Sequence, residues 1–330
     1  QRLEELQNLP AAPVAPQPAP APDDVRCFTV ERIQLHGVTL LSAAQQSALL
    51  EPFRGQCLGV EQLNSLLKTI TDAYLARGYV TTRAYLPQQD LADGVLEIRV
   101  VEGRLESLEG GEIATPRELG MGFPGATGEV LNLRDLEQLV DQLNRLPSLQ
   151  AELQVLPGEV LGASRVQLAG QREKPWRLNA NRNNDGLPST GEQQWGLGFD
   201  WDSPLGLADQ LVLRGSGDTL SDSQRQSDSQ SLIYSLPYGW WTVSYSYNQN
   251  SYRSQTDAAG FDFKQHGDSQ TQQLRAERVL RRDEVSKTAA SIAAGHIRTR
   301  NYLEDALLDV SSSDLSSAQL GFNHGRRIGS

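Results

Sequence analysis

The residues best suited to chemistry in this chain are its two cysteines, Cys27 and Cys57, with a single histidine, His36, between them. A structural zinc site needs about four Cys or His ligands, so this set is too small and we expect no metal. Two cysteines at this spacing favour a disulfide, which indicates an oxidising compartment. Two buried free thiols in a reducing compartment are the alternative interpretation.

No group of side chains in the sequence suggests catalysis. The histidines are isolated from one another, and neither the nucleophile motif G-x-S-x-G nor the phosphate-binding loop G-x-x-x-x-G-K-[ST] is present. We therefore expect a protein that is not an enzyme, that has no cofactor, and that does not draw energy from a nucleotide.

Composition narrows the range of partners. The net charge of −11 argues against binding to a nucleic acid, because phosphate recognition requires clustered cations. No run of 18 or more apolar residues occurs, so a membrane-spanning helix is excluded, although a membrane barrel is not. With 330 residues, 38% of them apolar, the chain is long enough for two or three folded units.

Residues 1–25 form a separate region. Leu3, Leu6 and Leu9 recur at roughly helical spacing and predict a short helix, for which a frayed terminus without a role is the alternative. The proline-rich stretch from Pro10 to Asp24 predicts an extended, semi-rigid linker.

Residues 26–102 have the pattern of a β-α-α-β-β module. A strand is predicted over 28–35, a helix over 42–53 with Ser42 as its cap, and a longer helix over 60–77 that stops at Gly78. The stretch RGYVTTRAYLPQQDLADGVLEIRVVEG then predicts two strands, Val80 to Leu86 and Val95 to Val101, joined through a proline and glycine turn.

Residues 103–174 repeat this order, which predicts two tandem α+β modules. A strand over 104–108 and a short helix over 115–120 precede LNLRDLEQLVDQLNRLP, whose leucines lie on one helical face. Two further strands, over 149–158 and 162–170, close the module. The apolar faces of all these helices are expected to form module cores.

From residue 175 to 330 the helical pattern is replaced by period-two alternation. In Gln194 to Trp201 and in Trp241 to Asn248, aromatic or aliphatic residues alternate with polar ones, and no helices remain to cover the apolar face. A transmembrane β-barrel is therefore favoured over a soluble sandwich, which also alternates. The eight predicted strands are 176–184, 194–201, 208–217, 229–238, 241–248, 270–282, 286–300 and 312–324.

Several of these stretches resemble one known family. The segments CFTVERIQLHG, ARGYVTTRAYLPQQDL, GVLEIRVVEGRLESL and NRNNDGLPSTGEQQWGLGFDWDSPLGLADQL occur in order between residue 26 and about residue 220. Together they resemble the outer-membrane transporters of two-partner secretion, of the haemolysin-activator and filamentous-haemagglutinin-transporter type. The stretch around Thr81, Thr82, Arg83 and Pro87 and the STG and SPLG segments are the most specific.

The resemblance implies a fold and a function. It implies a plug helix, a linker, two polypeptide-transport-associated (POTRA) modules in the periplasm, and a sixteen-stranded outer-membrane barrel of which this chain holds the first half. It also implies secretion of one large, unfolded adhesin or haemolysin, encoded nearby and here called the client, without ATP. We expect a monomer in contact with outer-membrane lipid. An assembly or insertion factor for outer-membrane barrels is the alternative function.

Candidate site residues follow from this interpretation. Strand Val80 to Leu86 is expected at a sheet edge, where an extended client can pair by strand addition, and Leu149 to Val155 is expected to repeat that surface. In the barrel, the polar face is expected to line a wet lumen. The client-binding candidates are Thr81, Arg83, Tyr85, Leu66, Ile70, Leu149, Ala151 and Leu153, and the lumen-facing candidates are Gln194, Asp200, Thr242, Ser244 and Asn248.

Overall fold

A computed structural model describes residues 27–91, 93–218, 225–258 and 261–327. The contacts of these described residues divide them into two compact units, one formed by the residues up to Ile70 with those of Ala84–Val100, the other by Thr71–Arg83 with those from Val101 on. The predicted helix around Leu3 to Leu9 and the proline-rich linker lie outside the described residues.

The first module has the predicted order with two additions. The predicted first strand is divided at Glu31, because the N–H groups of Glu31 and Arg32 both donate to the carbonyl of Gly94. A short extra strand also pairs with its first part; this strand contains Cys57, the disulfide partner of Cys27, and places it opposite Thr29. The elements are β1 (Phe28–Val30), β2 (Arg32–His36), α2 (Ala43–Leu50), η1 (Glu51–Phe53), β3 (Gln56–Leu58), α3 (Val60–Leu75), β4 (Arg83–Tyr85) and β5 (Val95–Val101).

The predicted helix signals of this module are confirmed. Ser42 and Gln45 form a reciprocal capping box at the start of α2. Helix α3 ends before Gly78, whose φ of +90° is a left-handed conformation that glycine adopts without steric cost. The N–H of Tyr79 closes this turn by donating to the carbonyl of Tyr74.

The second module repeats the first. Its elements are β6 (Arg104–Glu109), α4 (Pro116–Gly122), α5 (Leu133–Asn144), β7 (Leu149–Pro157) and β8 (Ala163–Arg172). The sheet order β6-β8-β7 corresponds to β2-β5-β4 in the first module, and in both sheets the first strand runs parallel to the last. Leu136, Leu139 and Leu143 on α5 are fully buried, which confirms the predicted core face.

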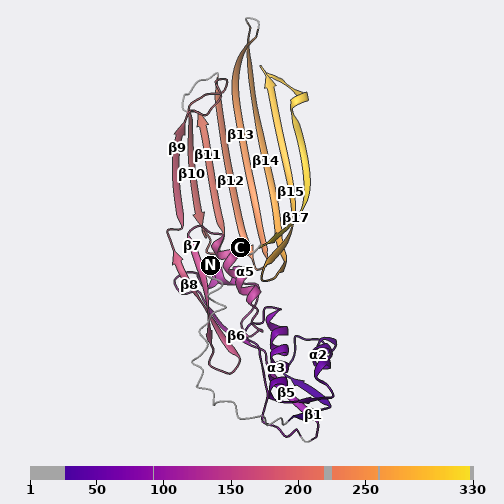
Figure 1. Cartoon of the computed structure of the whole chain (residues 1–330). Helices are drawn as coiled ribbons and strands as arrows, with labels where there is room; N and C mark the ends of the chain where they lie inside the picture. Colours follow the sequence, from indigo (N-terminus) through magenta and orange to yellow (C-terminus); the bar gives the residue numbers. More distant parts are fainter. Residues whose placement is uncertain (1–26, 92, 219–224, 259–260, 328–330) are drawn as a thin grey trace. The chain divides into compact units, whose positions relative to one another are not determined.

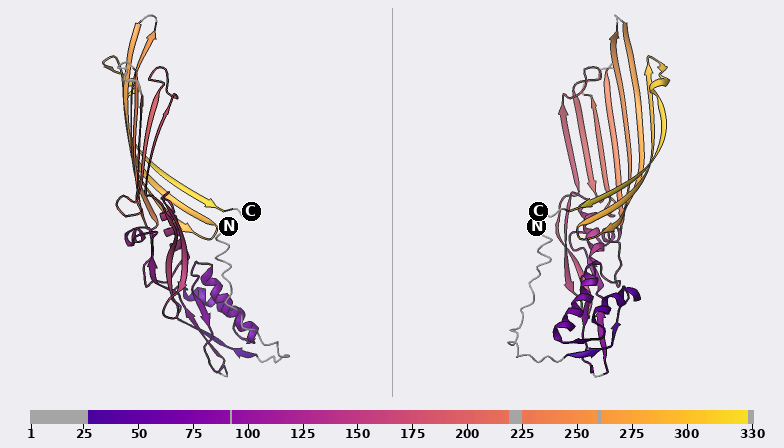
Figure 2. Two further views of the ribbon diagram at one scale, coloured as in Figure 1. Left: turned by 90° about the vertical axis from the view of Figure 1, so that its left-hand side faces the viewer. Right: turned by 45° about the vertical axis from the view of Figure 1, so that its right-hand side comes forward.

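Beyond the modules lies one antiparallel sheet, visible as a continuous curved layer in Figures 1 and 2. Its order is β16-β15-β14-β13-β12-β11-β10-β9, with β17 also paired to β15. The strands are β9 (Trp176–Asn183), β10 (Gln194–Asp202), β11 (Gln210–Asp218), β12 (Gln226–Tyr238), β13 (Trp241–Ala258), β14 (Phe261–Arg282), β15 (Ser286–Leu303), β16 (Ala306–Leu307) and β17 (Ser313–Arg326).

All eight predicted strands of this region are present, but several are longer than predicted. Strand β13 continues ten residues past the predicted end at Asn248, to Ala258. The added segment is polar, so it has no apolar alternation, yet its backbone pairs with β14 throughout. Ladder hydrogen bonds join backbone groups and do not require apolar side chains, which explains the missed length.

The two faces of the sheet differ in polarity. The register places Phe199 between Leu178 and Leu213, and Tyr245 between Tyr234 and Leu274, all on one face. Serine, threonine, asparagine and charged side chains predominate on the other. Among the described residues, no helix combines the length and apolar character needed to cross a membrane.

Candidate functional site

Strands β4 and β7 are the edge strands predicted for the two modules. Each lies at one end of its three-stranded sheet. An edge strand carries backbone N–H and C=O groups that have no partner within the sheet, and an extended polypeptide can pair with them. The candidate site therefore has two such edges, and the side chains around them decide how much of each edge is accessible.

The edge in the first module is shorter than predicted, because β4 covers only Arg83–Tyr85. Thr81 lies in the preceding turn, and its Oγ1 is buried without a hydrogen-bond partner. Thr82 is fully buried and accepts a hydrogen bond from the N–H of Gly103 at 3.4 Å. The prediction that Thr81 lies on the edge strand is therefore wrong, because Thr81 and Thr82 lie in a turn whose hydroxyl groups are buried in the protein.

The other two predicted residues of this edge do lie on β4. The guanidinium of Arg83 folds back onto its own chain and donates to the carbonyls of Val80 and Thr82 at 2.8 and 2.7 Å. The side chain of Tyr85 is 44% exposed. Tyr85 is thus a predicted side chain that is exposed to a partner at this edge.

The predicted groove residues of the first module belong to its core. Leu66 and Ile70 on α3 have no solvent-exposed surface. They are located where an amphipathic helix packs its apolar face against its sheet. Their assignment to an accessible groove is therefore wrong.

In the second module the predicted residues lie on edge strand β7, but their side chains point into the core. Leu149 and Ala151 are each only 3% exposed and belong to the main apolar cluster, and Leu153 is half-buried against it. A client at this edge would form hydrogen bonds with the backbone of β7 and would not contact these side chains.

The five predicted lumen residues share one face of the large sheet. The register joins Asp200 to Val212, Val212 to Ile233 and Ile233 to Ser246, which places even-numbered residues of β10 and β13 on the same side. Asp200 forms an ion pair with Arg214 at 2.7 Å. Gln194 donates to Ser227 at 3.0 Å. Whether this face lines a lumen stays a prediction.

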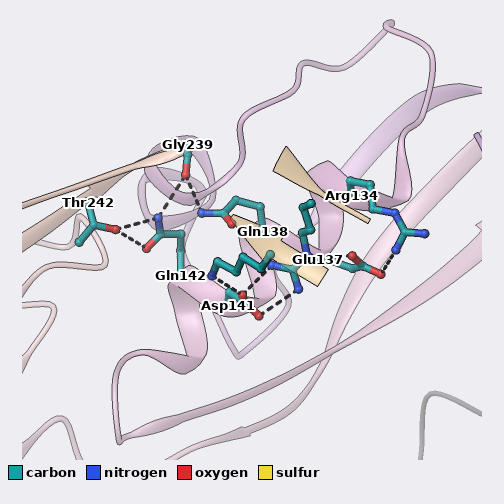
Figure 3. A network of polar contacts seen from close by, with 9 residues as sticks. Arg134, Glu137, Gln138, Asp141, Gln142, Gly239 and Thr242 are labelled. Atoms are coloured by element: carbon teal, nitrogen blue, oxygen red, sulfur yellow. Dashed lines mark hydrogen bonds and ion pairs between the residues drawn. The ribbon is translucent and has the colours of Figure 1, made fainter. Parts of the chain in front are cut away.

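Sequence reasoning missed the junction between helix α5 and this polar face, drawn in Figure 3. The side-chain amide of Gln142 donates to the carbonyls of Gly239 and Trp241, each at 3.2 Å, and to the hydroxyl of Thr242 at 3.1 Å. Gln138 donates to the same carbonyl of Gly239, also at 3.2 Å. Two glutamines of α5 thus hold the turn between β12 and β13.

An ionic cluster, which we call the α5 latch, lies beside these glutamines. Arg282 at the end of β14 contacts Glu137 at 2.9 Å and Asp141 at 2.6 Å, and Lys287 on β15 contacts Asp141 at 2.9 Å. Burial acts to raise the pKa of Asp141, but hydrogen bonds from Arg282 and Lys287 outweigh it and hold the pKa below its usual range. The latch residues are Glu137, Asp141, Arg282 and Lys287.

A second connection joins the module to the SPLG turn between β10 and β11. The buried carboxylate of Glu118 accepts two hydrogen bonds from Arg172, at 2.8 and 3.0 Å, and one from Ser203 in that turn. Arg145 at the end of α5 donates to the carbonyl of Ala208 at 2.6 Å. The second module is therefore attached to the sheet at two places.

Between α5 and the sheet lies an open polar groove of about 460 Å³. Its lining includes Asp141 and Arg145 of the module and Thr242, Ser244 and Arg275 of the sheet. Two of the predicted lumen residues are thus next to the module. A polar signal was present in the sequence, since Glu137, Gln138, Asp141 and Gln142 form a continuous patch on α5.

These features define a class of protein with tandem α+β modules followed by a large antiparallel sheet of two unlike faces. A family profile described as haemolysin secretion/activation protein ShlB/FhaC/HecB matches residues 162–330. A ShlB-type POTRA profile matches residues 28–103, and another POTRA profile matches 100–157. The chain belongs to the ShlB/FhaC/HecB family of haemolysin secretion/activation proteins.

Named relatives agree with this assignment. The outer membrane transporter CdiB of Dickeya dadantii is 37% identical over 99% of this chain and 59% of its own length. The hemolysin transporter protein ShlB of Serratia marcescens is 35% identical over 98% of this chain and 57% of its own length. The structure of CdiB from Escherichia coli superposes with a TM-score of 0.88 at 36% identity, covering 99% of this chain and 61% of that one.

The chain thus spans a little under two thirds of the length of these relatives. The predicted family and fold class, POTRA modules followed by antiparallel barrel-type strands, are confirmed. The predicted pairing of Cys27 with Cys57 is present as well.

Proposed function

We propose that this protein is an outer-membrane transporter that recognises an unfolded exoprotein through its POTRA modules and passes it outward through its barrel. The observation that carries the proposal is the combination of two modules with accessible strand edges and a sheet whose polar face begins at the second module. The relatives named as a hemolysin transporter and as outer membrane transporters support it.

Recognition in this proposal takes place at strands β4 and β7. A client in the periplasm is extended, so its backbone can add to an exposed edge, and main-chain hydrogen bonds supply most of the affinity. On β4 the exposed ring of Tyr85 lies beside such a client. The partner is an exoprotein encoded beside the transporter, and the transporter acts as a monomer in outer-membrane lipid.

Passage in this proposal uses the polar face of the sheet. An unfolded chain with apolar segments is retained weakly by a wet, hydrogen-bonding surface, because such a surface keeps its own water. Asp200, Ser244 and Asn248 lie on that face. The driving force is folding of the client outside the cell, since the sequence has no ATP-binding loop of the type G-x-x-x-x-G-K-[ST].

The direct test of the proposal is passage without nucleotide. The full-length transporter is reconstituted into lipid vesicles, and the unfolded exoprotein encoded beside it is added to the side that carries the modules. Protease-protected exoprotein is expected inside the vesicles without ATP. Protection that requires ATP, or equal protection in vesicles without the transporter, contradicts the proposal.

Secretion from cells tests the β4 edge separately. Arg83→Glu places a carboxylate where the guanidinium now contacts the carbonyls of Val80 and Thr82, so the edge should lose its present conformation. We expect less exoprotein in the culture medium at an unchanged amount of folded transporter. Unchanged export removes Arg83 from the recognition role.

A further inference from the structure

The outward-facing backbone of β7 is occupied at both ends. Backbone groups alternate along a strand, and Ser148 and Gly158, both even-numbered, bond toward the β8 side through Glu173 and Ala163. The odd-numbered residues of β7 therefore present their N–H and C=O groups to the open edge. Leu149, the first of them, already donates its N–H to the carbonyl of Leu146 at 2.9 Å.

The side chain of Asn144 occupies the next outward pair. Its amide nitrogen donates to the carbonyl of Ala151 at 3.0 Å, and its amide oxygen accepts from the N–H of Ala151 at 2.6 Å. A side-chain amide has the same donor and acceptor as a peptide group. Asn144, the last residue of α5, thus stands where one peptide group of an added strand would bind.

Pro157 closes the other end. Proline has no N–H to offer a partner, and its carbonyl accepts a hydrogen bond from Nε of Arg165 at 3.3 Å. Between these two ends, the outward groups of Leu153 and Val155 have no hydrogen-bond partner among the described residues. Leu153 and Val155 therefore offer two N–H and two C=O groups with which an added strand can pair.

The side chains along this opening are apolar and accessible. Val155 is 40% exposed and Leu156 is 38% exposed, and in an extended strand they project from opposite faces. A strand paired at this edge would place its own side chains beside both of them. An extended polypeptide with apolar residues therefore fits this surface in backbone and in side chains.

We propose that an extended client strand adds to β7 only within the window from Leu153 to Val155, and that Asn144 and Pro157 set the ends of that window. The inference rests on the proposed function, because it specifies how the second module binds its client. Asn144 thus fixes the register of the client strand. It occupies the N–H and C=O groups of Ala151, so the client cannot pair there.

The first module contains the same device at another strand. The side-chain amide of Gln89 donates to the carbonyl of Glu97 at 2.8 Å and accepts from its N–H at 2.7 Å. Glu97 lies on β5, and Gln89 follows the short edge strand β4. In both modules an amide side chain therefore stands in for a neighbouring peptide group, although in the first module it does so on the central strand β5.

A proline substitution tests the window without breaking the sheet. In Val155→Pro, the lost N–H faces outward, so the β7–β8 ladder is kept, whereas one client-facing donor disappears. The full-length transporter in detergent is titrated with the unfolded N-terminal domain of the exoprotein encoded beside it. Because one hydrogen bond is lost, we expect about fivefold weaker binding. Val155→Ile keeps the N–H, the β-branch and the apolar side chain, and its affinity should stay within about twofold.

Amide hydrogen exchange of the same protein tests the role of Asn144. Without client, the Ala151 N–H of Asn144→Ala should exchange roughly fivefold faster than in the wild type. Asn144→Asp, which keeps an acceptor, should protect it. With the exoprotein domain added, Leu153 and Val155 should gain protection in every variant, and Ala151 should gain it only in Asn144→Ala.

The outcomes separate this inference from the proposed function. If the domain binds but leaves Leu153 and Val155 unprotected, or if Asn144→Ala leaves the client footprint unchanged, the window is overturned while the transporter function stands. If the domain does not bind the wild-type transporter at all, both are overturned.

Discussion

At the scale of single residues, Glu118 determines how the second module responds to acid. Its carboxylate is fully buried on α4 and bonds Arg172, Ser203 and the N–H of Thr115. Burial raises its pKa, but these hydrogen bonds outweigh burial and lower the pKa from 4.5 to about 2. The carboxylate is therefore more acidic in the folded module than in the unfolded chain.

This difference predicts an acid-dependent loss of stability. Above pH 4.5 the contribution of Glu118 is complete, and it is lost as the pH falls from there toward 2, because the unfolded chain takes up the proton first. The loss amounts to about 3 kcal/mol. Thermal unfolding followed by the helical circular dichroism signal should show Glu118→Gln less stable at pH 7 and less sensitive to acid.

The control for this prediction is Glu112→Gln, which changes an exposed carboxylate of the same module. It should keep both the stability and the acid response of the wild type. Equal acid responses in the wild type and Glu118→Gln would show that Glu118 is not the group responsible.

The disulfide acts at the same scale in the first module. Cys27 and Cys57 are 30 residues apart in sequence and link the start of the module to β3. Closing a loop of this length restricts the unfolded chain and stabilises the fold by about 3 to 4 kcal/mol. The double variant Cys27→Ser with Cys57→Ser should unfold at lower denaturant concentration, and a reductant should reproduce this in the wild type only. Unchanged unfolding after reduction would exclude a stabilising role.

At the scale of elements, helix α5 supplies most of the contacts described between the second module and the sheet. One of its faces packs leucines into the core, and the adjacent face supplies Gln138, Gln142 and the latch carboxylates. Because Arg282 is mostly buried between Glu137 and Asp141, its loss leaves two carboxylates close together.

The latch predicts a measurable change in the position of α5. Arg282→Glu should repel Glu137 and Asp141 and broaden the distance distribution between spin labels on α5 and on the turn after β14, measured in the intact protein. Arg281→Glu is the matched control, since Arg281 is adjacent and largely exposed. Identical distributions in the two variants would mean that the latch does not hold the helix.

Much of the order of helices and strands was predictable from the sequence, because it depends on local patterns. Apolar periodicity and the cap at Ser42 are properties of short segments, and they predicted the helices and the tandem order. The alternation in Gln194 to Trp201 predicted both faces of the sheet in the same way. The shortening of β4 was missed because Thr82 turns inward to bond Gly103, a contact that no local pattern reports.

The junction could not be predicted for a related reason. Its contacts join residues 100 and 145 positions apart, such as Gln142 with Thr242 and Glu137 with Arg282. On a helical wheel, Glu137, Gln138, Asp141 and Gln142 look like an ordinary solvated face. Likewise, Leu66 and Ile70 have the same pattern whether a helix lines a groove or fills a core, and burial alone decides between them.

At the scale of the whole molecule, the proposed function assigns client binding to the edge strands of the modules and client passage to the polar face of the sheet. Edge strands offer backbone pairing, the window on β7 limits that pairing to a few residues, and the polar groove beside α5 leads onto the polar face of the sheet. Short pairing windows make each contact weak and reversible. Reversible contacts are what a transporter needs, because the client must leave each site.

Selective recognition of the client is the central claim, and calorimetric titration tests it most directly. The intact transporter in detergent is titrated with the unfolded N-terminal domain of the exoprotein encoded beside it, and in parallel with an unrelated unfolded chain of similar length. The account predicts saturable binding of the first, at micromolar strength or better, and none of the second. Equal binding of both chains, or of neither, would contradict it and favour a general role in barrel assembly.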